Sequence, residues 1–129
     1  MATNHILTVV CDDFRQEANG KFVLIGVYPG QSLGVPSVPF LIPVLSFYQQ
    51  WSTDFGGPRQ LTASLYPSAG GPLIMQLAGV LNPPNPGIFA GVLQFRNVMI
   101  PQFGRYRLIT MIGPENAPVV VEFAVALPA

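Results

Sequence analysis

Charged side chains are scarce in this chain: only 9% of its 129 residues are Asp, Glu, Lys or Arg, against about 25% in ordinary globular domains. Six basic and six acidic residues give a formal net charge of zero. The sequence therefore carries no excess of basic charge that would attract nucleic acid or an anionic membrane, and we expect neither as a partner. The length corresponds to one domain, which we expect to span residues 1–129.

Reactive side chains are equally rare. A single cysteine, Cys11, and a single histidine, His5, exclude an intrachain disulfide framework and a cysteine-rich zinc site. On one strand the two residues would share a face but lie about 20 Å apart, because a strand rises about 3.3 Å per residue. They therefore cannot form a Cys–His nucleophile pair. We expect no catalytic residue, no metal and no cofactor, in a protein that is not an enzyme.

No secretory leader or membrane-spanning segment is indicated. The first basic residue is Arg15, and the apolar run Ile6–Cys11 is short and ends in two aspartates, which does not fit a signal peptide. The most apolar segment, Phe40–Leu45, contains a proline and is far shorter than the roughly 20 residues that cross a bilayer. We expect a cytoplasmic protein, in which a lone reduced cysteine is ordinary.

Room for long helices is also lacking. Fourteen prolines follow Tyr28, and each removes a backbone donor and clashes with the preceding helical turn. Apolar and polar residues instead alternate with period two, as in Val119–Leu127. Turn sequences separate such runs and place strands near 5–11, 21–28, 40–53, 59–66, 73–81, 89–99, 105–112 and 118–127. This pattern predicts an all-β antiparallel sandwich of about 7–8 strands, with Greek-key connections of the C2 or immunoglobulin type.

Tyr106 follows Pro101 and begins the surest hairpin of the chain, so two interpretations are open. It is either an ordinary core aromatic or a tyrosine corner, in which the hydroxyl bonds to backbone a few residues upstream.

The last three predicted strands expose an apolar face. Opposite the expected core they carry Val92, Val98, Ile109, Met111 and Val120. The segment 31–43 adds further apolar residues: Leu33, Val35, Val38, Phe40 and Leu41. Soluble monomers rarely expose an apolar patch of more than a few hundred Å². We predict that this face is an interface in a homo-oligomer or a larger protein assembly; the alternative is a monomer whose loops cover it.

Five of the twelve charges lie within ten residues: Asp12, Asp13, Arg15, Glu17 and Lys21. One interpretation is an ion-paired hairpin tip that fixes strand register, although exposed pairs stabilise by only about 0–1 kcal/mol each. The other is a polar recognition site for a ligand or a protein.

A third aspartate, Asp54, allows an alternative function as a binding module. Together with Asp12 and Asp13 it could form a calcium or ligand site at a loop end, as in a C2-like binding module, although the spacing matches no known calcium loop.

The segment Cys11–Tyr28 reads CDDFRQEANGKFVLIGVY. It resembles the N-terminal signature C-D-D-x-R-x-E, then G-K-x-x-L-I-G-V-Y, of a family of small bacterial proteins of unknown function, some of them phage-associated. The resemblance implies a compact β domain and supplies no activity, substrate or cofactor. The resemblance and the apolar face together lead us to expect a non-enzymatic β-sandwich that acts by self-association or by docking into a larger assembly. We include an assembly of phage origin in this expectation.

Overall fold

A computed structural model of the chain describes residues 3–54, 56–68, 70–83, 85–113 and 118–128. Strands dominate these ranges, and the one helical element described is a single 3-10 turn at Pro29–Gln31. The strands are β1 (Thr3–Gln16), β2 (Phe22–Val27), β3 (Ser32–Gly34), β4 (Phe40–Thr53), β5 (Arg59–Pro67), β6 (Met75–Leu81), β7 (Gly87–Ile100), β8 (Gly104–Ile112) and β9 (Val119–Ala126). The prediction of an all-β fold is confirmed.

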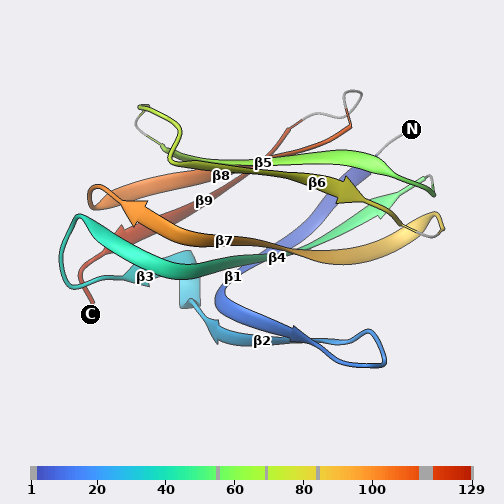
Figure 1. Ribbon diagram of the computed structural model, residues 1–129, viewed down its shortest axis with the longest axis horizontal. Helices are drawn as coiled ribbons and strands as arrows, with labels where there is room; N and C mark the ends of the chain where they lie inside the picture. The colour runs from blue at the N-terminus through green and yellow to red at the C-terminus, as the bar shows by residue number, and fades with distance from the viewer. Residues whose placement is uncertain (1–2, 55, 69, 84, 114–117, 129) are drawn as a thin grey trace.

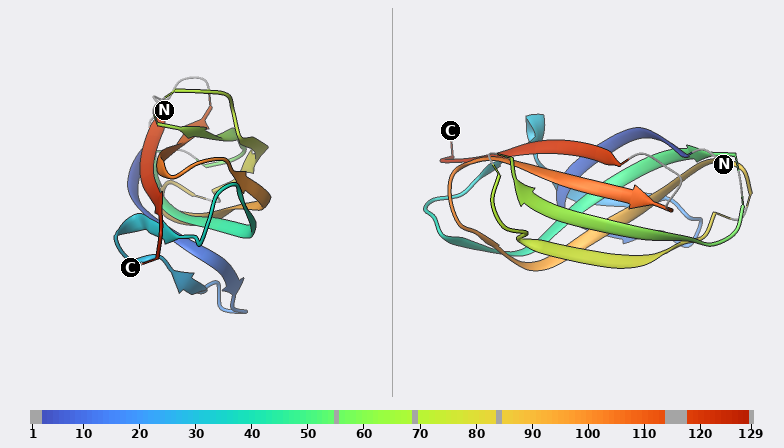
Figure 2. Two further views of the ribbon diagram at one scale, coloured as in Figure 1. Left: turned by 90° about the vertical axis from the view of Figure 1, so that its left-hand side faces the viewer. Right: turned by 90° about the horizontal axis from the view of Figure 1, so that it is seen from above.

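The strands form two sheets that pack face to face (Figure 1). One sheet has the order β2-β1-β4-β7, and the other has the order β3-β9-β8-β5-β6. Pairing is antiparallel except between β3 and β9, which run parallel. The end-on view in Figure 2 shows the β1–β2 hairpin extending away from the body of the sandwich.

Aromatic rings from both sheets fill the core, because alternate residues of each strand point between the sheets. The Phe47 ring lies 5.9 Å from the Phe95 ring of β7 and 5.6 Å from the Phe123 ring of β9. Tyr106 stacks on Phe123 at 5.7 Å. These contacts join β4 and β7 of one sheet to β8 and β9 of the other.

Tyr106 forms the tyrosine corner. Its side chain is fully buried, and its hydroxyl donates a 2.5 Å hydrogen bond to the carbonyl of Gln102, four residues upstream. Burial raises the pKa of the Tyr106 phenol, which keeps the donor proton in place. Of the two interpretations open from sequence, the structure supports the corner.

The alternation of buried and exposed side chains along β7 changes phase at Asn97, and this change corrects the predicted orientation of Val98. Asn97 has the left-handed φ of 56°, so the chain turns there and both Phe95 and Val98 point into the core. Ile42 and Leu45 on the neighbouring β4 show the same three-residue step between buried positions. The prediction that Val98 faces outward is wrong, because the side chain is fully buried.

The segment 31–43 contributes to the core and not to an outer patch. Leu33 of β3 and the following Val35 are buried, and Val38 and Phe40 pack against the core in partly buried positions. Only Leu41 is exposed among the five apolar residues expected there. The parallel pairing of β3 with β9 causes this difference, because it draws the segment against the sandwich.

β1 continues to Gln16, well past the predicted end at Cys11. Its register shifts between His5 and Leu7. Consequently His5 lies opposite the inward Trp51, while Cys11 lies opposite Ser46 on the other face. The expectation that His5 and Cys11 share a face is therefore wrong. None of the helices in the described ranges has the length and apolar character needed to cross a membrane.

Candidate functional site

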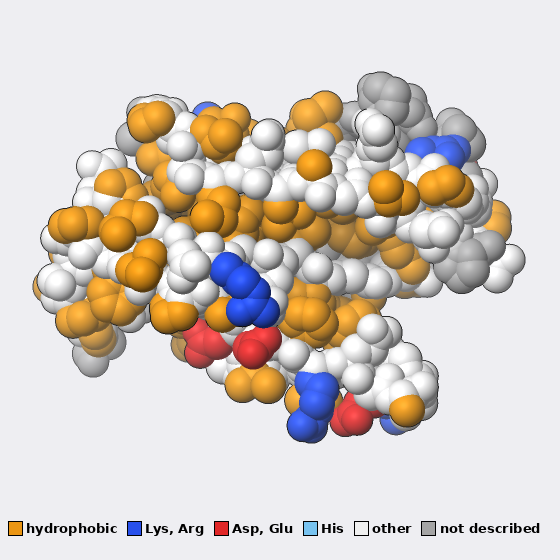
Figure 3. All heavy atoms as spheres, in the orientation of Figure 1, with side chains coloured by type: hydrophobic (Ala, Val, Ile, Leu, Met, Phe, Trp, Pro, Cys, Tyr) orange, Lys and Arg blue, Asp and Glu red, His pale blue; other side chains and the backbone are white. Residues whose placement is uncertain are grey.

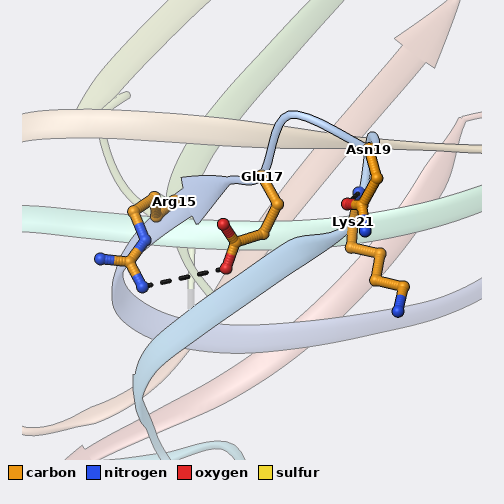
Figure 4. A network of polar contacts seen from close by, with 4 residues as sticks. All are labelled: Arg15, Glu17, Asn19 and Lys21. Carbon is orange, nitrogen blue, oxygen red and sulfur yellow. Dashed lines mark hydrogen bonds and ion pairs between the residues drawn. The ribbon is translucent and has the colours of Figure 1, made fainter.

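The tip of the β1–β2 hairpin holds three of the five clustered charges (Figure 4). Arg15 Nη2 lies 3.9 Å from Glu17 Oε1, and the two side chains are 68% and 45% exposed. The turn closes through the Glu17 N–H, which donates to the Lys21 carbonyl at 2.7 Å. Asn19 Oδ1 accepts from the Lys21 N–H at 3.1 Å. A solvated pair of this kind contributes about 0–1 kcal/mol, so backbone bonds do more than charge to fix this turn.

Asp12 and Asp13 lie away from that tip, within β1 itself. Asp12 Oδ1 accepts a hydrogen bond from the Tyr28 hydroxyl. Asp12 also faces Gly26, which has a φ of +67°, and a Cβ at Gly26 would lie 2.9 Å from the Asp12 Cγ. Asp13 Oδ1 accepts from Gln94 Nε2 of β7 at 3.0 Å. Each carboxylate is thus held by a separate partner.

A pocket of about 420 Å³ opens beside these carboxylates. We call it the β1–β3–β4 pocket. Its walls come from the end of β1, the β3 segment and the start of β4, and they are mostly apolar. The lining residues are Asp12, Asp13, Tyr28, Leu33, Gly34, Val35, Phe40, Ile42, Pro43 and Val44. A volume in this range, with apolar walls and a few convergent polar groups, is typical of a ligand site.

Two carboxylates, those of Asp12 and Asp13, line the rim of this pocket. Among the described residues, neither Asp12 nor Asp13 forms an ion pair. Asp13 is linked to a cation through Gln94, because Gln94 Nε2 donates to Asp13 Oδ1 at 3.0 Å and Gln94 Oε1 accepts from Arg96 Nη2 at 2.9 Å. Arg96 lies opposite the pocket residue Val44 in the register of β4 and β7. Burial and the hydrogen bond to Asp12 raise the pKa of Tyr28 well above its usual range. The phenol therefore stays protonated at neutral pH and keeps donating to the carboxylate.

Cys11 lies fully buried beside the two aspartates. Burial raises the pKa of its thiol, and the neighbouring charges of Asp12 and Asp13 raise it further. Reactive cysteines are partly exposed in electropositive surroundings that lower the thiol pKa. The site of Cys11 has the opposite properties, and the structure offers the thiol no activation.

The three aspartates of the calcium alternative are not brought together. Cys11 pairs with Ser46, and Asp54 follows the far end of β4 eight residues later, about 26 Å along the strand at 3.3 Å per residue. Throughout the described ranges, no group of three His, Cys, Asp or Glu side chains could hold a metal ion. The predicted trio of Asp12, Asp13 and Asp54 is therefore wrong as one site.

The predicted apolar face divides between the two sheets. Val92 lies half-buried on β7 of the four-stranded sheet. Ile109 and Met111 of β8 and Val120 of β9 remain together on the outer side of the five-stranded sheet, where Ile109 pairs with Val120. Met111 is 40% and Val120 54% exposed. With the adjacent Arg107 and Glu122, these three residues make up what we call the β8–β9 face.

Polar contacts border the apolar residues of the β8–β9 face. Arg107 pairs with Glu122 in the register of β8 and β9. The Arg107 guanidinium lies 6.0 Å from the centre of the Tyr66 ring, and the Ser68 hydroxyl donates to Glu122 Oε2 at 3.0 Å. Both charges are therefore held in place beside the apolar row. Elsewhere, most charged side chains visible in Figure 3 lie on or beside the β1–β2 hairpin.

Sequence reasoning missed Tyr28 and the apolar walls of the β1–β3–β4 pocket, and it missed Gly26, against which the Asp12 carboxylate lies. One local signal was present: a glycine inside an apolar strand often marks a close approach of another group, and Gly26 interrupts such a run. The walls carried no signal, because apolar residues of segment 31–43 read equally well as surface or core.

Comparison with protein families gives one match over most of the chain. The family of unknown function DUF6941 matches residues 6–123. The chain belongs to this family. Membership agrees with the resemblance to a family of unknown function, and it assigns no activity. No curated protein matches the chain in sequence.

Solved structures share only general architecture with this family member. A β-glucosidase from Erythrobacter marinus aligns over 96% of this chain and 15% of its own, with 6% identity and a TM-score of 0.51. A β-glucosidase from Listeria innocua covers 74% of this chain and 14% of its own, with 11% identity and a TM-score of 0.46. The chain spans a small part of both enzymes, so the first likeness concerns the fold alone and the second carries no weight.

Proposed function

We propose that this protein is a non-enzymatic β-sandwich that functions by self-association, as a homodimer or as the repeating unit of a larger protein assembly. The observation that carries the proposal is the β8–β9 face, where Ile109, Met111 and Val120 form an apolar row on an exposed sheet. Fully burying one such side chain stabilises by about 1.5–3 kcal/mol. Because the chain has so few charged side chains, little charge repulsion opposes the burial of this row against another apolar surface.

The β8–β9 face is self-complementary, which favours a second copy of this chain as its occupant. Ile109 pairs with Val120, and Arg107 pairs with Glu122, across the same two strands. A two-fold axis between β8 and β9, parallel to the strands, would place Ile109 of one copy on Val120 of the other. The same axis would set each Arg107 against a Glu122, and isologous interfaces require such matching.

Substitutions on two sheets test this proposal. The double variant Met111→Lys/Val120→Lys puts four like charges into the two-fold interface, and we expect it to be a monomer by light scattering on a sizing column. Ile88→Lys is the matched control, because Ile88 is 72% exposed on the edge strand of the other sheet. An oligomer that survives the double variant, with unchanged far-UV circular dichroism, would contradict the proposal.

The remaining parts of the proposal follow from composition. Zero net charge supports a protein partner over nucleic acid or an anionic membrane, and the single thiol supports the cytoplasm as the compartment. An assembly of phage origin stays a prediction that rests on the resemblance of segment 11–28 alone.

A further inference from the structure

The β1–β3–β4 pocket reaches down to core side chains. Leu33, Val35 and Ile42, each at most 5% exposed, line its wall together with Pro43 and Val44. Above this buried floor, the lining residues Phe40, Pro43 and Val44 are half-buried or exposed, so they offer apolar surface to a hydrocarbon chain or ring. At about 420 Å³, the pocket suits a small molecule, because ligand sites usually span roughly 300–1,000 Å³.

Asp12 is held at the rim before any ligand arrives. The Tyr28 hydroxyl donates to its Oδ1, and the absence of a side chain at Gly26 leaves room for its Oδ2, which a Cβ there would displace. Binding to a carboxylate already held in one orientation loses less side-chain entropy than binding to a freely rotating carboxylate. Oδ2 accepts no hydrogen bond among the described contacts of Asp12.

The charge at the rim selects the ligand's polar group. Asp12 and Asp13 are both exposed and form no ion pair with a described residue. Asp13 is linked to Arg96 through Gln94, whereas no such link to a cation is described for Asp12. The Asp12 carboxylate repels an anion, and for a protonated amine Coulombic attraction adds to the hydrogen bond. A bare metal ion is disfavoured, because the described residues include no group of three His, Cys, Asp or Glu side chains that could hold one.

We infer that the β1–β3–β4 pocket binds a small organic ammonium, with its apolar chain or ring against Phe40, Pro43 and Val44 and its protonated amine on Asp12. The site is separate from the β8–β9 face, so this binding does not depend on the proposed self-association.

Titration calorimetry with n-hexylamine tests the inference on the intact protein at pH 7 and low salt. We expect saturable binding of hexylamine, with n-hexanol and hexanoate at least tenfold weaker because they lack the cationic group. Asp12→Asn keeps the acceptor for Tyr28 and removes the charge, and it should weaken hexylamine at least tenfold. Glu17→Gln removes one charge from the same hairpin, away from the pocket, and should leave the affinity within twofold of wild type.

A separate variant tests the apolar part of the β1–β3–β4 pocket. Val44→Phe fills part of the pocket without changing its charge, and it should weaken hexylamine at least tenfold as well. Thermal melts of each variant show whether the fold is kept. The inference is overturned if wild-type protein shows no hexylamine binding up to 10 mM, if hexanol binds as tightly, or if Asp12→Asn binds like wild type.

Discussion

The effect of a substitution at Gly26 on the free energy of unfolding can be predicted, because two separate terms oppose any side chain at this position. Its φ of +67° disfavours any L side chain, and an added Cβ would also collide with the Asp12 carboxylate. The left-handed conformation costs about 1–2 kcal/mol for a residue with a Cβ, and pushing the Asp12 carboxylate off the Tyr28 hydroxyl loses a hydrogen bond to a charged group, which adds up to about 3 kcal/mol. We therefore expect Gly26→Ala to lower the free energy of unfolding by about 2–5 kcal/mol.

Gly30 supplies the matched control. It has a similar φ of +62°, and a Cβ there would meet nothing within 4 Å. Gly30→Ala should thus cost only the backbone term, about 1–2 kcal/mol. In thermal denaturation followed by circular dichroism, one kcal/mol corresponds to about 4 °C for a chain of this size. Gly26→Ala should melt clearly below Gly30→Ala.

A double-mutant cycle separates the collision from other effects. Asp12→Ala removes the carboxylate that the new Cβ would strike, so its cost should be smaller in the Gly26→Ala background than in wild type, by about 1–3 kcal/mol. Equal melting of Gly26→Ala and Gly30→Ala, or a coupling of zero in the cycle, would refute the close packing of Asp12 on Gly26.

Three further predictions concern buried groups. Tyr106→Phe removes the donor to the Gln102 carbonyl and should cost about 1–2 kcal/mol in urea unfolding; no loss would exclude a stabilising corner. Burial raises the folded-state pKa of Tyr28 above its unfolded value near 10, so the stability it contributes is complete below pH 10 and is lost as pH rises. Tyr28→Phe should flatten the decline in unfolding free energy between pH 9 and 11.5, and an unchanged slope would contradict this. Cys11 should react with a thiol reagent only as fast as the protein opens, and rapid labelling of the native state would show that its burial is wrong.

Local patterns predicted the strands well because proline, glycine and alternation act within a few residues. The observed β4, at Phe40–Thr53, has the predicted bounds. Val98 was misplaced because the phase of β7 depends on the backbone conformation of Asn97. Asparagine tolerates that conformation without requiring it, so composition and alternation alone could not locate the change.

The site was partly visible in the sequence. The charges of Asp12 and Asp13 were singled out, and both line the β1–β3–β4 pocket. The contacts of Asp12 with Gly26 and Tyr28 depend on how β2 returns along β1, since fourteen and sixteen residues separate them from the aspartate. Pairing register of that kind arises from the whole hairpin and cannot be read from one strand.

Self-association is the central claim, and the molar mass of the wild-type protein in solution tests it most directly. Light scattering on a sizing column across a hundredfold range of concentration should give at least twice the chain mass of 13.9 kDa, with dissociation only at the dilute end. A mass of 13.9 kDa at every concentration would contradict the account and leave the β8–β9 face without a second copy to cover it.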